Sequence, residues 1–153
     1  MTITARLEPH LLDPAKELDH FIRGRTNDGA VVSFTGLARG RAGDGEAVST
    51  LHLEHYPGMT EQTILDACIA CEARFKVSDI LVVHRWGDIA PGGPIVFVAA
   101  ASSHRSEAFA AADYLMDRLK TEAAFWKRED GPKTSRWIEP TPADIERRAR
   151  WSD

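Results

Sequence analysis

The sequence has no apolar run of membrane-spanning length, no excess of positive charge and few cysteines. A spanning helix needs about 20 consecutive apolar residues, and residues 1–8 lack the apolar core of a signal peptide, so we expect a cytoplasmic protein without a membrane partner. The net charge of -4 argues against general nucleic-acid binding, which normally requires a basic surface. We therefore expect no nucleic-acid partner.

The two cysteines, Cys68 and Cys71, form a Cys-x-x-Cys pair, a pattern typical of redox centres or half of a zinc site. The pair lies deep inside a helical pattern, on one stripe with Ile64, Leu65 and Phe75, whereas redox pairs usually begin a helix. No second pair and no histidine at zinc-finger spacing follows. We interpret both as small buried hydrophobic residues in a reducing compartment and expect no metal.

The composition, 43% hydrophobic and 27% charged, fits one globular domain over residues 1–153. Asp13 and Pro14 form a helix start. Periodicity predicts strands over 3–7, 30–36, 48–55, 78–86 and 95–101, and helices over 14–23, 60–75 and 103–120. Residues 125–139 predict a β-hairpin, and 140–153 a peripheral tail with a short helix. This order indicates an α+β fold with a mixed sheet.

Lys120 and Lys127 flank an Ala-Ala-Phe-Trp segment in this acidic protein. On one unbroken helix their amines would share a face, roughly 10 Å apart; if 125–139 is a hairpin, Lys127 lies on a strand instead. Desolvation and like charge both lower a lysine pKa, so the pair predicts an anion site with a reactive amine. The alternative is an ordinary helix C-terminus, where cations offset the dipole.

Two further segments carry candidate ligands. The glycine-rich segment 37–45 contains Leu37, Ala38 and Arg39; it is either a loop that closes on a ligand or a hairpin connection with solvated arginines, and it lacks the P-loop pattern. His52 and His55 point to opposite faces of one strand and should not share a metal ion.

His104 and Arg105 lie at a predicted helix N-terminus, after serines that can cap it, where the helix dipole favours an anion. Lys120 ends the same helix, about 25 Å away, so His104 and Lys120 of one chain cannot meet directly. A single site that uses both ends needs a second subunit or a chain that folds back. This geometry favours an oligomer.

Six motifs in order, over about residues 28–139, resemble the large, catalytic subunit of molybdopterin synthase. They are Phe34-Thr35-Gly36 with Arg39, the segment 53–59 (LEHYPGM), His84-Arg85-x-Gly87, Ser103-His104-Arg105, Asp117-x-x-Lys120 and the segment 125–129 (FWKRE). Two departures from the family pattern are Leu37, where a basic residue is common, and the absence of proline from 121–124.

The resemblance implies an α/β-hammerhead fold and a homodimer within a heterotetramer. Each large subunit would receive the Gly-Gly thiocarboxylate tail of a small ubiquitin-like sulfur carrier and convert cyclic pyranopterin monophosphate to molybdopterin, without a cofactor. It implies catalytic roles for Lys120 and Lys127, with His104 and Arg105 supplied by the neighbouring subunit. The implied substrate-binding residues are Leu37, Ala38, Arg39, His104, Arg105, Lys120, Lys127, Arg128 and Glu129.

Two alternatives of other classes remain at this point. A non-catalytic module would use the same basic pocket only to hold a ubiquitin-like tail or a phosphate ligand. A nucleic-acid-binding protein would use Trp126, Trp137 and nearby arginines for stacking and phosphate contacts.

Overall fold

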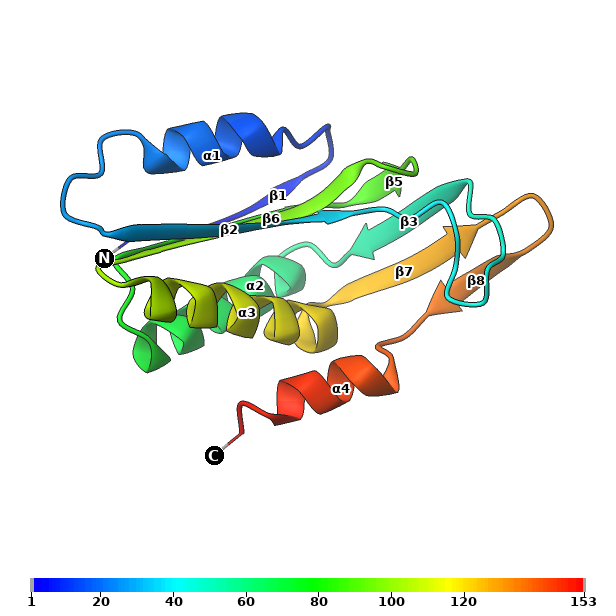
Figure 1. The fold of residues 1–153 in the computed structure, drawn as a ribbon. Coiled ribbons are helices and arrows are strands. Elements are labelled where there is room, and N and C mark those ends of the chain that lie inside the picture. The colour runs from blue at the N-terminus through cyan, green and yellow to red at the C-terminus, as the bar shows by residue number, and fades with distance from the viewer. Residues whose placement is uncertain (1, 153) are drawn as a thin grey trace.

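The structure, a computed structural model, describes residues 2–152, so Met1 and Asp153, the ends of the predicted domain, lie outside it. The described residues form two four-stranded sheets and four helices (Figure 1). The elements are β1 (Thr2–Glu8), α1 (Pro14–Ile22), β2 (Ala30–Leu37), β3 (Thr50–His55), α2 (Met59–Arg74), β4 (Asp79–Arg85), β5 (Gly87–Ile89), β6 (Pro94–Ser102), α3 (Arg105–Glu122), β7 (Phe125–Asp130), β8 (Ser135–Ile138) and α4 (Pro142–Ala149).

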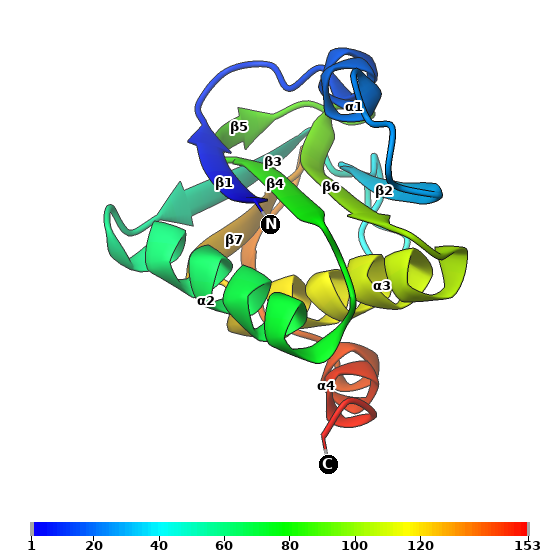
Figure 2. The same cartoon turned by 90° about the vertical axis from the view of Figure 1, so that its left-hand side faces the viewer.

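The first sheet has the strand order β1-β4-β6-β2, and it is mixed, as predicted, because β1 and β4 are parallel while the other pairs are antiparallel. Helix α1 covers one face, and α2 and α3 cover the other (Figures 1 and 2). Successive residues of β4 therefore serve different layers. Ile80 and Val82 pack with α2 and α3, whereas Leu81 and Val83 pack with Phe21 of α1.

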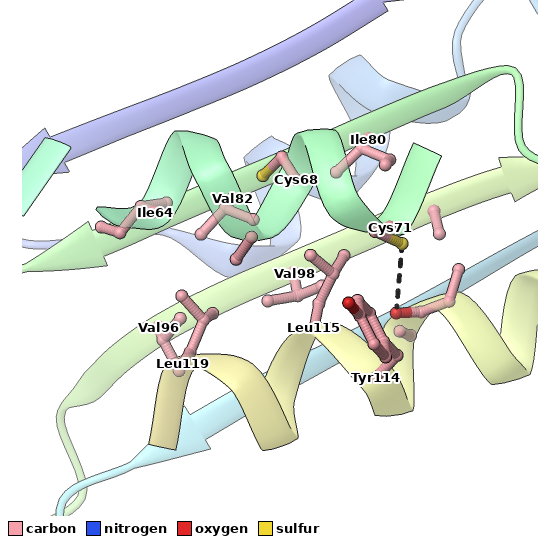
Figure 3. Packing of buried hydrophobic residues seen from close by; sticks show 14 residues of the cluster. Ile64, Cys68, Cys71, Ile80, Val82, Val96, Val98, Tyr114, Leu115 and Leu119 are labelled. Atoms are coloured by element: carbon pink, nitrogen blue, oxygen red, sulfur yellow. Dashed lines mark hydrogen bonds between the residues drawn. The ribbon is translucent and has the colours of Figure 1, made fainter. Parts of the chain in front are cut away.

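The main hydrophobic core lies between the first sheet and helices α2 and α3 (Figure 3). Cys68 and Cys71 are fully buried there as free thiols, and the Cys71 thiol donates a weak hydrogen bond to the Ala111 carbonyl oxygen at 3.7 Å. Burial raises the pKa of each thiol to about 12. The interpretation of this pair as buried hydrophobic residues is confirmed.

The second sheet, β5-β3-β7-β8, is wholly antiparallel and contains the predicted C-terminal β-hairpin, β7 with β8. The sequence predicted one mixed sheet, and neither β5 nor a separate second sheet was expected. Gly87 explains the difference: its φ of +93° turns the chain directly after β4, so that β5 joins β3 instead of extending the first sheet. Helix α3 ends at Glu122, which excludes the single-helix geometry for Lys120 and Lys127.

Of the two helix starts predicted from capping residues, that of α1 is confirmed and that of α3 differs. The Asp13 side chain accepts a hydrogen bond from the Lys16 amide, and Pro14 begins α1, as predicted. A serine cap was predicted for α3, but the N-cap is His104, whose side chain makes no capping bond. The chain is still extended at His104, and the Ser102 hydroxyl accepts a hydrogen bond from its amide instead.

Helix α4 lies on α3 and has no buried residue, consistent with a peripheral tail. Arginines hold it in place: Arg147 and Arg150 form ion pairs with Asp113 and Asp117 of α3. The Trp151 indole also donates a hydrogen bond to Asp117 at 2.7 Å. Within residues 2–152, no helix combines the length and apolar character that a membrane crossing requires.

Candidate active site

Lys120 and Lys127 come from different layers and meet at the same cavities. Lys120 lies in the last turn of α3, and Lys127 is the third residue of β7 in the second sheet. Both side chains line two adjoining cavities, of about 320 Å³ and about 210 Å³. The two cavities, which we call the lysine pocket, also share Leu37, Ile95 and Leu119 as lining residues.

The segment between the two lysines is fixed by the start of α2. The buried Thr60 hydroxyl donates a hydrogen bond to the Ala124 carbonyl oxygen at 2.6 Å and accepts one from the Tyr56 amide at 2.8 Å. The Ala124 amide donates to the Thr63 hydroxyl at 3.1 Å. The connection from α3 to β7 is therefore held through both backbone groups of Ala124, its amide and its carbonyl oxygen.

The electrostatic environment of Lys127 favours its neutral form. Burial is the main cause that lowers the pKa of Lys127 from 10.5 to about 8, the charge of Lys120 adds to it, and Asp144 acts in the opposite direction. About one-tenth of Lys127 is then neutral at pH 7, many times more than for a solvated lysine. Within the described chain, neither lysine forms an ion pair or hydrogen bond, so both amines are open to a ligand.

The larger cavity brings together several residues predicted from the sequence. Leu37, Ala38, Arg39 and Glu129 line it with the two lysines. Ala38 is fixed by backbone bonds to the 91–94 turn, from its amide to the Gly93 oxygen and from the Gly92 amide to its own oxygen. Arg39 is exposed, and its guanidinium supplies a cation at the cavity wall.

The glycine-rich segment after Arg39 forms a narrow hairpin rather than a phosphate loop. Arg41 and Ala47 form an isolated antiparallel bridge, and the Arg41 side chain donates to the Gly45 oxygen. Arg136 of β8 holds Asp44 through two hydrogen bonds of 2.7 and 2.8 Å. This arrangement matches the predicted alternative, a hairpin connection with solvent-exposed arginines.

The structure does not bring His104, Arg105 or Arg128 to the lysine pocket. His104 and Arg105 are exposed at the N-terminus of α3, which is 18 residues or about 27 Å long, while Lys120 lies near its other end. Arg128 follows Lys127 on β7 and points to the opposite face of the sheet. There it binds Asp130 at 2.7 Å and lies over the Trp137 ring.

Sequence reasoning missed several residues of the pocket. His84 lines the smaller cavity, and Glu139, Thr141 and Asp144 line the larger one. Glu139 is the last residue of the predicted hairpin segment, and Asp144 lies in the predicted tail; neither carboxylate was predicted to be a site residue. Only His84 carried a sequence signal, because it belongs to the motif His84-Arg85-x-Gly87 and is a titratable residue directly after a continuous apolar run.

A separate apolar cavity of about 720 Å³ lies beside the lysine pocket, between β2, α3 and α4, and shares Lys120 with it. Phe34 and Phe109 line it and are 41% and 61% exposed. Ser106, from the first turn of α3, lies at the same cavity. An apolar surface of this kind is typical of a contact with another protein.

The sequence and the fold match those of one protein family. The sequence model of the MoaE protein family matches residues 7–122, and the chain belongs to that family. It is 47% identical over 151 residues to the molybdopterin synthase catalytic subunit of Caulobacter vibrioides, covering 99% of this chain and 97% of that protein. Membership makes this chain an enzyme subunit of molybdenum cofactor biosynthesis.

Solved structures agree with this assignment. The molybdopterin biosynthesis MoaE protein from Burkholderia ambifaria has a TM-score of 0.81 and 36% identity over 99% of both chains, which confirms the predicted α+β fold. A complex of subunits 1 and 2 of molybdopterin-converting factor from Helicobacter pylori shares the fold, with a TM-score of 0.72, 16% identity and coverage of 88% of this chain and 89% of that one.

Proposed function

We propose that this protein catalyses the sulfur-transfer step of molybdopterin synthesis. It takes sulfur from the C-terminal Gly-Gly thiocarboxylate of a small ubiquitin-like partner and adds it to cyclic pyranopterin monophosphate, forming the dithiolene over two transfers. The observation that carries the proposal is the lysine pocket, where two unpaired amines meet and one has a strongly lowered pKa. The names of its relatives agree with this reaction.

The two amines suit the two demands of the reaction. The sulfur forms a bond to the substrate carbon, and the acyl carbon of the tail loses sulfur and gains water oxygen, which requires proton transfers and stabilisation of developing negative charge. Lys120 performs the acid-base or covalent step. Lys127, with its pKa of about 8, orients the substrate and shares proton transfer near neutral pH. Either ammonium stabilises the oxyanion formed at the acyl carbon.

The phosphate of the substrate requires further cations. Arg39 supplies one from the wall of the larger cavity. His104 and Arg105 lie too far from Lys120 in one chain, so the neighbouring subunit of a homodimer supplies them. The exposed apolar surface around Phe34 and Phe109, close to the start of α3, supports such a contact.

The sulfur donor completes a heterotetramer of two large and two small subunits. The Helicobacter pylori structure, a complex of two subunits of molybdopterin-converting factor, supports a partner of this kind. The two free, buried cysteines support work in the reducing cytoplasm.

Turnover tests the function directly. Purified protein is mixed with thiocarboxylated partner and cyclic pyranopterin monophosphate, and the dithiolene product is quantified. Lys120→Ala should abolish product while partner binding, measured by calorimetry, stays within about twofold. Lys133→Ala is the matched control, because Lys133 is exposed in the β7–β8 turn and should leave turnover unchanged. A folded wild type that binds the partner but yields no product would refute the enzymatic assignment.

Subunit complementation tests the composite site. His104→Ala and Lys120→Ala homodimers should each be inactive, because every site lacks one group. In a mixed dimer, one site carries both defects and the other is intact. Random exchange of subunits should therefore restore about one quarter of wild-type turnover. No recovery, with exchange verified by mass spectrometry, would contradict the shared site.

A further inference from the structure

His84 is a buried titratable side chain at the end of an apolar stripe. In β4 it follows Ile80 and Val82 on the face that packs against α2 and α3, and only 5% of its surface is exposed. A polar ring at such a position costs free energy unless its nitrogen atoms find partners. The fold therefore holds a histidine where packing alone would favour an aliphatic residue.

The orientation of the His84 ring is fixed at both its edge and its face. Its Nδ1 lies 2.8 Å from the Arg85 carbonyl oxygen, which can only accept, so Nδ1 carries the proton and donates. Phe125 stacks on the ring with centroids 4.2 Å apart and planes 25° apart. In this tautomer the other nitrogen, Nε2, presents a lone pair.

The Nε2 atom of His84 borders open space. Within residues 2–152, Arg85 Nε is the one side-chain nitrogen or oxygen that is completely enclosed and lacks a hydrogen bond. His84 Nε2 also forms no hydrogen bond there, but it is not completely enclosed, and His84 is one of the residues that line the 210 Å³ cavity. Lys120 and Lys127 line the same small cavity.

The surroundings keep the ring neutral. Burial is the main cause that lowers the pKa of His84 to about 4; the hydrogen bond to Arg85 acts in the opposite direction, and the charges of Lys127 and Lys120 contribute to the lowering. Charged groups face this pocket from α3, β7, the β2–β3 loop and the tail. They are Lys120, Lys127, Glu129, Arg39, Glu139 and Asp144. Three of these are carboxylates that could compete for a lysine.

We propose that His84 is a positioning residue for Lys127, whose ammonium donates a hydrogen bond to His84 Nε2 when its side chain rotates within the shared cavity. An acceptor without charge directs the amine without forming an ion pair, so Lys127 can still lose its proton. The remaining N–H bonds then point to a defined place in the pocket. The catalytic consequence rests on the proposed function, whereas the contact between the two side chains does not.

Two substitutions separate this role from simple packing. His84→Phe keeps the stacking on Phe125 but removes the acceptor, whereas His84→Gln loses the ring and keeps a polar acceptor near Nε2. If the acceptor matters, Phe should raise the acid dissociation constant of Lys127 about tenfold, because the ammonium loses its bond, and Gln should change it less. A packing role predicts the reverse order, with Phe tolerated and Gln damaging.

The measurement is an NMR titration of isotope-labelled lysine side chains in the complete protein, with the Lys127 signal assigned through Lys127→Arg. His55→Phe is the matched control, since the His55 ring packs against Trp86 at a tilt, with ring centroids 4.4 Å apart, and His55 lines neither lysine cavity. We expect an unchanged Lys127 titration in this control. An unchanged Lys127 titration in folded His84→Phe would overturn the proposal and favour the carboxylates as its partners.

Turnover supplies the second readout. His84→Phe should reduce turnover about tenfold and move the limb of the pH profile that follows Lys127 to lower pH, while His84→Gln should retain more activity. Full activity with an unshifted profile in His84→Phe would also overturn the proposal. If the wild type shows no turnover at all, the proposed function fails, and the titration still decides the role of His84.

Discussion

Replacing Lys127 with methionine should stabilise the protein while it removes activity. Methionine fills the space of the aliphatic stem but carries no charge. The pKa of Lys127 falls from 10.5 to about 8 on folding, and each pKa unit corresponds to about 1.4 kcal/mol, so holding this ammonium in the pocket costs roughly 3 kcal/mol at pH 7. The side chain keeps some contact with water in the open cavity, which reduces the expected gain to about 1–3 kcal/mol.

The size of the effect depends on pH. Between pH 8 and pH 10.5 the unfolded chain still binds a proton that folded Lys127 has lost, so wild-type stability rises with pH over this range. The advantage of Lys127→Met should therefore be constant below about pH 8 and disappear above about pH 10.5. The measured quantity is the difference between wild type and variant, because other groups titrate equally in both.

Urea and thermal unfolding at equal protein concentration provide the assay. At pH 7 we expect a rise in Tm of about 2–10 °C for Lys127→Met. Lys133→Met, which removes a solvated ammonium from the exposed turn, should change the free energy of unfolding by less than about 0.5 kcal/mol. If Lys127→Met is no more stable than wild type at pH 7, the desolvation argument for Lys127 is wrong.

Two other predictions concern groups outside the lysine pocket. Asp117→Ala should lower the free energy of unfolding by about 2–3 kcal/mol and release α4, because buried Asp117 binds Arg147, Arg150 and Trp151. Release of α4 should be seen as trypsin cleavage at Arg150, and an Arg150 that stays protected would contradict this prediction. Burial raises the pKa of Asp117, but the hydrogen bonds from Trp151 and Arg150 outweigh burial and hold this pKa below 3.8. The stabilisation by the Asp117 carboxylate is therefore present above pH 3.8 and should be lost as the pH falls below that value. The thiols of Cys68 and Cys71 each have a pKa of about 12, so they should resist iodoacetamide at pH 8 and react only after unfolding. Labelling of the native protein would contradict this and show that the core opens locally.

The elements that bury a regular apolar face were predictable from the sequence. The apolar runs of β4 and β6 and the Asp13–Pro14 helix start all appear where the pattern places them. The split into two sheets was not predictable, because β5 has only three residues, too few to show a period. Its pairing depends on the turn at Gly87 and on contacts with β3, which no local pattern reveals.

The site was predictable in part. Sequence motifs place Arg39, Lys120, Lys127 and Glu129 in one group, and the fold brings them to one cavity. The same motifs include Arg128, although strand alternation sends it to the other face of the sheet. Asp144 could not be found in advance, because the path of the tail past the pocket is set by ion pairs between α4 and α3.

Two threonines at the start of α2 help to set the distance between the amines of Lys120 and Lys127. Thr60 and Thr63 bind the carbonyl oxygen and the amide of Ala124, in the short connection between the helix of Lys120 and the strand of Lys127, although neither threonine lines the lysine pocket. Random mutagenesis should therefore recover inactive variants at Thr60 that fold and still present both amines. For protein engineering, the same position offers a means to change the gap between two reactive nitrogen atoms without altering any group that meets the substrate.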